Sequence, residues 1–167
     1  MAVTSSNRAR LTLPTDEQIL IEREFDAPRH LVYRAYTTPD LVRRWWHANR
    51  GEVISIDIDL RVGGKWRYVM TACSGPEVAF RGEYREILPN ERIVLTSFYE
   101  GVPEGVTEDS ATTVNTVTFT EVEERTRLTL LIEAKSKMAR DAIIESGMED
   151  GLQDALDLLE RLAASLR

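Results

Sequence analysis

The chain has 167 residues, of which 43% are hydrophobic and 29% are charged, and its net charge is −7 at pH 7. This length and composition predict one soluble globular domain that is long enough to bury a substantial core. The sequence has no lysine- or arginine-rich tract, which disfavours both binding to nucleic acid through phosphate contacts and attraction to an anionic membrane surface.

At the N-terminus, residues 1–16 are mostly polar and predict a flexible arm, followed by a single domain over residues 17–167. The first residues lack the apolar segment of a signal peptide, and no apolar run approaches the roughly 20 residues that cross a bilayer. Cys73 is the only cysteine, so an internal disulfide is excluded. We therefore expect a cytoplasmic protein without membrane insertion.

The domain begins with a strand and two short helices. Residues 18–25 alternate apolar and polar side chains, which is typical of a strand, and Leu11–Leu13 is a further candidate edge segment. Pro28 and Pro39 are each placed to start a helix, because proline is favoured in the first helical turn. These helices are expected over residues 30–36 and 39–46.

A series of strand patterns separated by Gly, Pro and Asn turns occupies the middle of the chain. The predicted strands cover residues 53–60, 65–73, 78–87, 92–99, 112–121 and 126–134. Residues 100–110 contain two glycines, one proline and four acidic residues, and predict a solvated loop. Consecutive strands joined by short turns predict an antiparallel meander.

A long amphipathic helix is predicted at the C-terminus. Apolar side chains recur there at spacings of three and four residues, at Ile144, Met148, Leu152, Ala155, Leu159, Leu162 and Leu166. A short helix over residues 137–146 precedes it, and Ser146-Gly-Met-Glu149 has the form of a capping box, which predicts a kink or restart. Because the apolar face needs cover, we predict an α+β fold with a curved antiparallel sheet of about six to seven strands around this helix.

Five motifs in this order resemble those of a known family. They are Phe25-Asp-Ala-Pro28, Trp45-Trp46, the segment Asp59–Trp66, the segment Gly82–Arg92, and Gly147–Gly151 ahead of the leucine-rich helix. Together they are similar to the bacterial branch related to the heat-shock-protein-90 ATPase activator, within the START-like, birch-pollen-allergen-like superfamily (SRPBCC). The resemblance covers residues 18–167. It implies a helix-grip fold with a hydrophobic pocket between the long helix and the sheet.

The expected function is binding of a small, mostly hydrophobic molecule in that pocket. The candidate ligand-binding residues lie at predicted inner-face positions or at the pocket mouth: Trp45, Trp46, His47, Trp66, Tyr68, Met70, Phe80, Asn115, Phe119, Met148, Gly151 and Leu152. Dense packing of the same side chains without a cavity is the alternative reading. Within the long helix, the part around Met148 and Gly151 is expected to be pocket wall, and residues 159–166 are expected to be core.

Several of these positions have two interpretations. Trp45 and Trp46 form a wall at the pocket mouth or fill the gap between helix and sheet, and at least one is expected to be structural. Gly82 and Gly151 leave room for a ligand or allow the long helix to lie close to the sheet, and this close packing is slightly preferred. Asn115 forms hydrogen bonds either with a polar group of the ligand or with the protein backbone, which it then holds in place.

No catalytic residue, metal site or cofactor is predicted. His30 and His47 are the only histidines, and with one cysteine in another element they do not form a zinc-ligand pattern. The chain is therefore expected to be a binding protein rather than an enzyme. A polyketide cyclase-type enzyme and a module that interacts with a chaperone ATPase are the alternatives, and a homodimer is left open.

Overall fold

In the part of the chain that the structure describes, residues 8–167 of a computed structural model, the strands form one antiparallel sheet. The strands are β1 (Arg10–Thr12), β2 (Gln18–Phe25), β3 (Gly51–Ile58), β4 (Lys65–Ala72), β5 (Glu77–Leu88), β6 (Arg92–Tyr99), β7 (Thr113–Val122) and β8 (Arg125–Glu133). The helices are α1 (Arg29–Thr37), α2 (Pro39–Val42), α3 (Glu108–Ala111), α4 (Lys137–Glu145) and α5 (Met148–Ser165). This succession confirms the predicted α+β class.

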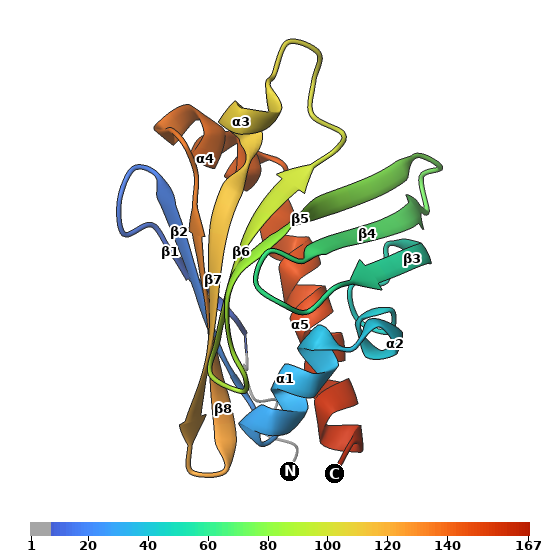
Figure 1. Ribbon diagram of the computed structural model, residues 1–167, viewed down its shortest axis with the longest axis vertical. Coiled ribbons are helices and arrows are strands. Elements are labelled where there is room, and N and C mark those ends of the chain that lie inside the picture. Colours follow the sequence, from blue (N-terminus) through green and yellow to red (C-terminus); the bar gives the residue numbers. More distant parts are fainter. Residues whose placement is uncertain (1–7) are drawn as a thin grey trace.

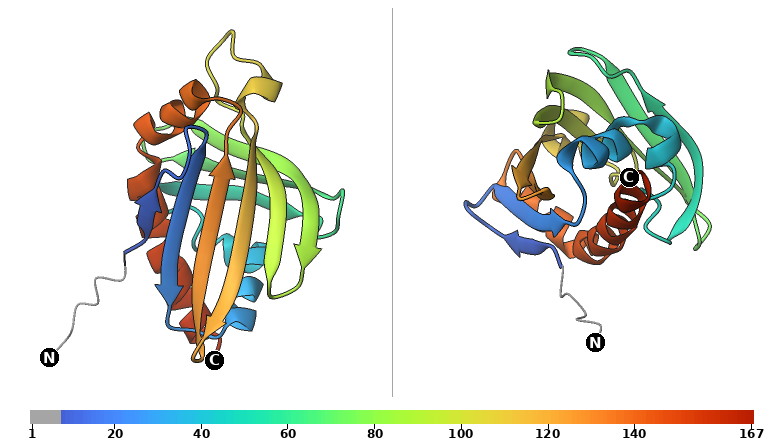
Figure 2. Two further views of the ribbon diagram at one scale, coloured as in Figure 1. Left: turned by 90° about the vertical axis from the view of Figure 1, so that its left-hand side faces the viewer. Right: turned by 90° about the horizontal axis from the view of Figure 1, so that it is seen from below.

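The order of neighbours in the sheet is β1-β2-β8-β7-β6-β5-β4-β3. After β2 the chain passes through α1 and α2 to the opposite edge, and then returns strand by strand until β8 pairs with β2. The sheet curves around the long helix α5, as Figures 1 and 2 show. This is the predicted helix-grip arrangement, with eight described strands instead of about six to seven.

The additional strand comes from the predicted N-terminal arm. β1 pairs with β2, and Leu11 lies opposite Ile21. Just before β1, the backbone N–H of Ala9 donates to Oε1 of Gln153 (2.9 Å), and Nε2 of Gln153 donates to the Ala9 carbonyl (2.8 Å). A side-chain amide offers the same donor and acceptor as a peptide group, so this pair fixes the arm to α5. The rest of the predicted flexible arm, residues 1–7, lies outside the described residues.

The second short helix is shorter than predicted. α2 ends at Val42 instead of Trp46, and tighter turns follow, such as the bond from the Trp45 N–H to the Val42 carbonyl (3.1 Å). Ala48 and Asn49 then adopt φ values of 52° and 60°. Residues other than glycine rarely enter this left-handed region. These two backbone conformations end the helical turns and direct the chain into β3.

The break between α4 and α5 lies at Gly147, where the sequence predicted a restart. Gly147 has a φ of 82°, a conformation that glycine adopts without the steric cost of a Cβ atom. The predicted capping box is wrong. The hydroxyl of Ser146 donates to the carbonyl of Ile143 (2.5 Å), and no side chain caps the first turn of α5.

The two halves of α5 differ in burial. Leu156, Leu159 and Ala163 are almost completely buried, at 2%, 0% and 0% exposure. Met148 and Leu152, nearer the N-terminal end, are only half-buried and pack against the edge of the core. The C-terminal half is therefore core, as predicted.

A buried arginine fixes α5 against the sheet. Arg23 points inward from β2 with 2% of its side chain exposed, and its Nη1 and Nη2 lie 2.8 Å from carboxylate oxygens of Asp157 and Glu160, respectively. Glu160 also accepts the backbone N–H of Asp26 (2.7 Å). A buried charge requires paired partners, so these contacts define how α5 lies against the end of β2.

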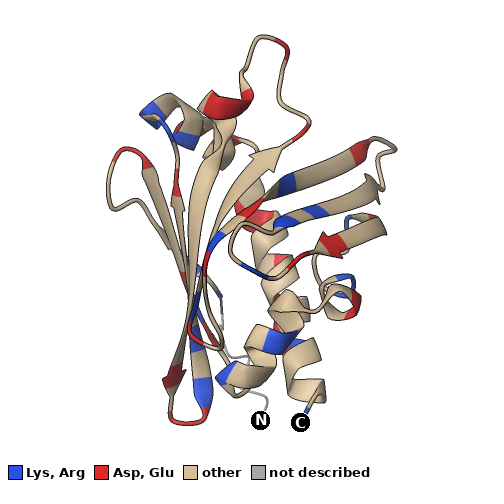
Figure 3. Ribbon diagram, in the orientation of Figure 1, with Lys and Arg blue, Asp and Glu red and all other residues tan. Residues whose placement is uncertain are grey.

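β4 carries basic residues only, whereas acidic and basic residues are interspersed along β5 (Figure 3). Among the described residues, none of the helices is long and apolar enough to cross a membrane.

Candidate functional site

A row of aromatic side chains lines the inner face of the sheet at β4, β5 and β6. This inner aromatic row consists of Trp46, Trp66, Tyr68, Phe80 and Tyr99. Phe80 lies opposite Tyr68 in the β4–β5 ladder and opposite Tyr99 in the β5–β6 ladder. The ring of Phe80 lies 5.0 Å from that of Tyr99, and the ring of Tyr68 lies 4.8 Å from that of Trp66.

Trp46 joins the row from the turn after α2. Its ring meets those of Tyr68 and Phe80 edge-on, at centroid distances of 5.4 and 6.1 Å. Edge-to-face contacts at these distances are favourable for aromatic pairs. The structure therefore brings together the predicted residues Trp46, Trp66, Tyr68 and Phe80.

Gly82 allows the indole of Trp66 to lie close to the sheet. Nε1 of Trp66 donates to the carbonyl oxygen of Thr96 (3.1 Å), and a Cβ atom on Gly82 would lie 1.8 Å from that same oxygen. Gly82 therefore allows close packing within the sheet, against β6 and Trp66, and not the predicted close approach of the long helix.

The inner face is mostly buried in one half of the sheet and partly exposed in the other. Ile19 and Phe25 on β2 and Val117 on β7 have 0% exposure. On β4–β6, Trp66 and Tyr84 are buried, but Tyr68 and Phe80 are only half-buried, and Tyr99 is 41% exposed. Large apolar side chains at inner-face positions are normally buried, so this part of the face is an incompletely covered apolar surface.

Trp45 and Phe119 lie in the core, apart from the row. Trp45 is 5% exposed, its Nε1 donates to the carbonyl of Ala35 (2.9 Å), and its ring packs on Tyr36. Phe119 is 1% exposed and meets the rings of Tyr33 and Tyr36 edge-on. The expectation that at least one tryptophan is structural is confirmed for Trp45.

Tyrosine hydroxyl groups add polar atoms to this region. Burial raises the pKa of Tyr68 well above its ordinary value. Burial also raises the pKa of Tyr84, and it raises that of Tyr36 to about 12. These phenols remain protonated at neutral pH, where they act as hydrogen-bond donors and not as general bases.

His47 and Asn115 have different surroundings. Nδ1 of His47 accepts the backbone N–H of Asn49 (2.9 Å), so this ring nitrogen stabilises the turn before β3. Asn115 lies half-buried on the inner face of β7, as its position in the alternation predicted. Its Oδ1 accepts a hydrogen bond from the hydroxyl of Thr113 (2.9 Å).

The remaining predicted residues border the row and α5. Met70 is half-buried and pairs in register with Val53 and Val78, while Met148 and Leu152 are half-buried on α5.

Gly151 has open space around it. The nearest atom to a Cβ built there would be Nε of Arg50, at 4.0 Å, so close packing does not explain this glycine. Arg50 in turn pairs with Asp154 at 2.6 Å.

Two shallow depressions lie away from the inner aromatic row. One, of about 440 Å³, follows the exposed side of α4 along Lys137, Met138, Asp141, Ala142 and Glu145. The other, of about 460 Å³, is bordered by Arg85, Thr96, Glu108, Asp109, Thr112, Val114 and Lys135. Neither involves a residue that the sequence predicted for ligand binding.

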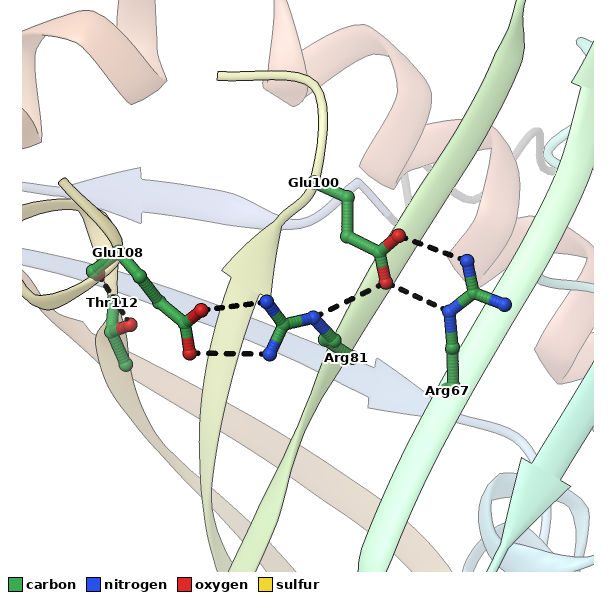
Figure 4. Close-up of polar contacts among 5 residues, drawn as sticks. All are labelled: Arg67, Arg81, Glu100, Glu108 and Thr112. Carbon is green, nitrogen blue, oxygen red and sulfur yellow. Dashed lines mark hydrogen bonds and ion pairs between the residues drawn. The ribbon is translucent and has the colours of Figure 1, made fainter. Parts of the chain in front are cut away.

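A chain of ion pairs joins the segment after β6 to the sheet (Figure 4). Glu108 pairs with Arg81 at 2.6 Å, Arg81 with Glu100 at 3.3 Å, and Glu100 with Arg67 at 2.8 Å. Thr112 adds a hydroxyl bond to the carbonyl of Glu108 (2.7 Å). These contacts tie Glu108 of α3 to β5, and they tie Glu100, which follows Tyr99 at the end of β6, to both β4 and β5.

The ion-pair chain predicts a pH dependence. Hydrogen bonding to Arg67 lowers the pKa of Glu100, and hydrogen bonding to Arg81 lowers that of Glu108. A lowered folded-state pKa means that the stabilisation is fully present above the ordinary value of 4.5 and is lost as the pH falls through the folded-state value. In an NMR titration of the carboxyl carbons, both midpoints are expected below 4.5.

Arg81→Met should raise the midpoint of Glu108, whereas the matched variant Arg67→Met should raise that of Glu100 and leave Glu108 nearly unchanged. An unaltered Glu108 midpoint in Arg81→Met would contradict the ion-pair chain.

Tyr99, Tyr36 and Tyr84 were not predicted as site residues. Tyr99 could have been found, because alternation from Ile93 through Leu95 and Ser97 places it on the inner face. The β6 segment is apolar on both faces, however, which hid that alternation. The position of Tyr36 depends on how α1 packs, and no pattern in the sequence reports it.

One protein family matches most of the chain. The family model described as Activator of Hsp90 ATPase homolog 1-like protein matches residues 26–164. Among curated proteins, none matches the chain.

Solved structures of bacterial proteins share the fold. A protein from Rhodobacter sphaeroides is 22% identical with a TM-score of 0.84, and the match covers 94% of this chain and 99% of that one. A protein from Nitrosomonas europaea is 22% identical with a TM-score of 0.79, over 92% and 97% of the two chains. A protein from Chromobacterium violaceum is 27% identical with a TM-score of 0.76, over 89% and 98%.

Proposed function

Because the chain belongs to the family of Activator of Hsp90 ATPase homolog 1-like proteins, whose helix-grip fold suits the enclosure of apolar molecules, we propose that it binds a small, mostly hydrophobic ligand. The ligand lies between α5 and the inner face of β4–β6, against the inner aromatic row. A fold alone does not define a function, so the proposal depends on this particular surface.

The observation that carries the proposal is the difference between the two halves of the inner face. In β2, β7 and β8 this face buries side chains such as Phe25 and Phe119 to 0% and 1% exposure. In β4–β6, Tyr68 and Phe80 are only half-buried, although they lie on the inner face of the sheet as Phe25 and Phe119 do. A ligand that covers them removes further apolar surface from water, which favours binding at roughly 25 cal/mol per Å².

The incomplete burial of the N-terminal end of α5 supports the same position for the ligand. Met148 and Leu152 are half-buried apolar side chains at the N-terminal end of this helix. Methionine adapts its shape to different partners, and Gly151 leaves space beside them.

The test is direct binding of an apolar probe, 2-isopropenylnaphthalene, measured by equilibrium dialysis. Trp46→Ala is expected to weaken binding about tenfold, because removing a central aromatic contact typically costs at least about 1.4 kcal/mol. The matched control is Val62→Ala in the β3–β4 turn, which is 65% exposed and should leave binding unchanged. Native mass spectrometry of freshly purified protein should also show a retained ligand mass. Equal probe affinity in wild type and Trp46→Ala would refute binding at this site.

A further inference from the structure

A polar patch interrupts the apolar inner face next to the inner aromatic row. It consists of Ser97 on β6 and Thr113 and Asn115 on β7. Ser97 lies opposite Thr113 in the β6–β7 ladder, and Asn115 lies opposite Leu95. Because side chains two positions apart on a strand share a face, Ser97 lies on the same face as Tyr99 and is its neighbour along β6.

The hydrogen bonds within the patch leave donors unused. The hydroxyl of Thr113, a residue with 7% exposure, donates to Oδ1 of Asn115 (2.9 Å) and lies 3.4 Å from the carbonyl of Ser97. With Oδ1 engaged, Asn115 presents its amide Nδ2. Among the described residues, neither Nδ2 of Asn115 nor the hydroxyl of Ser97 donates a hydrogen bond to another protein atom.

Because their surroundings are apolar, these donors favour a ligand that carries a hydrogen-bond acceptor over one that does not. Leu95 and Ile132 flank Asn115 in register on the two neighbouring strands, and Tyr99 continues the face beyond Ser97. A purely apolar ligand that displaced water from Asn115 would leave its amide without a partner, which is unfavourable. A ligand with an acceptor oxygen at this point would satisfy the amide instead.

We propose, building on the ligand-binding function above, that the ligand is a flat apolar ring system that carries a hydrogen-bond acceptor such as a carbonyl oxygen. The rings pack on Phe80 and Tyr99, whose own rings lie 5.0 Å apart and are tilted by 35°. The acceptor oxygen accepts from Nδ2 of Asn115, with the hydroxyl of Ser97 as a second donor. Sites built to hydrogen-bond a substrate group discriminate strongly against analogues that lack it.

The experiment compares two probes of the same shape, 2-acetylnaphthalene and 2-isopropenylnaphthalene, which differ in a carbonyl oxygen replaced by a CH₂ group. Asn115→Leu is expected to weaken binding of the ketone about tenfold and to leave the alkene unchanged or bound more tightly. Asn115→Asp, which keeps the size but removes the donor, should also weaken the ketone. The control is Thr116→Val, the neighbouring residue on the opposite face of β7, which should alter neither affinity.

The outcomes separate this inference from the proposed function. If both probes bind and Asn115→Leu and Asn115→Asp leave the ketone affinity unchanged, the acceptor-bearing ligand class is wrong and the apolar site stands. If neither probe binds to the wild-type protein, the proposed function fails, and this inference fails with it. Should Asn115→Leu lose its cooperative thermal unfolding, Asn115→Asp and Ser97→Ala provide the same comparison, and an unchanged ketone affinity in both overturns the inference.

Discussion

Replacing Gly82 with alanine is expected to destabilise the protein by about 3 kcal/mol, a cost at the upper end for overpacking a dense interior. The added Cβ would lie 1.8 Å from the carbonyl oxygen of Thr96 and 2.7 Å from Nε1 of Trp66. Neither atom can move freely, because Trp66 donates to that same oxygen and Thr96 is part of the β6 strand. Urea unfolding should therefore show a clearly lower midpoint.

The matched control is the same substitution at Gly151, where the sign is expected to reverse. The nearest atom to a Cβ there is 4.0 Å away, and Gly151 lies inside α5. Alanine is favoured over glycine by roughly 1 kcal/mol in a helix, so Gly151→Ala should raise the unfolding midpoint. Destabilisation of similar size by both substitutions would show that the two glycines do not differ in packing.

Replacing Phe119 with alanine is expected to cost about 3–5 kcal/mol, the range for removing a buried aromatic side chain. Phe119 is 1% exposed and contacts the rings of Tyr33 and Tyr36, so its loss leaves a cavity in the core. Phe80→Ala is the comparison. Phe80 is half-buried, so the loss of stability should be smaller, while probe binding should be impaired.

Unfolding and probe binding together therefore distinguish core from binding surface. A larger loss of stability for Phe80→Ala than for Phe119→Ala would contradict this division of the aromatic residues.

The period of two in the strands predicted the inner-face positions of several candidate residues. Tyr68, Phe80 and Asn115 were each assigned to the inner face from alternation alone, and the structure places them there. Alternation is reliable because a strand exposes its two faces to different environments, and a shift of one residue would move every side chain to the other face.

The neighbouring residues Trp45 and Trp46 show that the sequence pattern does not predict the environment of every side chain. Trp45 and Trp46 differ by one position, yet Trp45 is buried with a bond to Ala35 and Trp46 contacts Tyr68 and Phe80. The helical pattern over residues 39–46 continued in the sequence, but α2 ends at Val42. Tertiary contacts, not local preference, determine where such a short helix ends, because helices of one turn have little stability of their own.

The sequence by itself determined the α+β class, the antiparallel meander and the amphipathic C-terminal helix, because each follows from local periodicity of apolar side chains. It also placed the helix break at Gly147, where the backbone has a φ of 82°. Only the tertiary structure decided that β1 joins the sheet, that Gly82 allows close approach while Gly151 borders open space, and which aromatic residues remain half-exposed. These features depend on atoms from segments far apart in the chain, and their contacts leave no periodic pattern in the sequence.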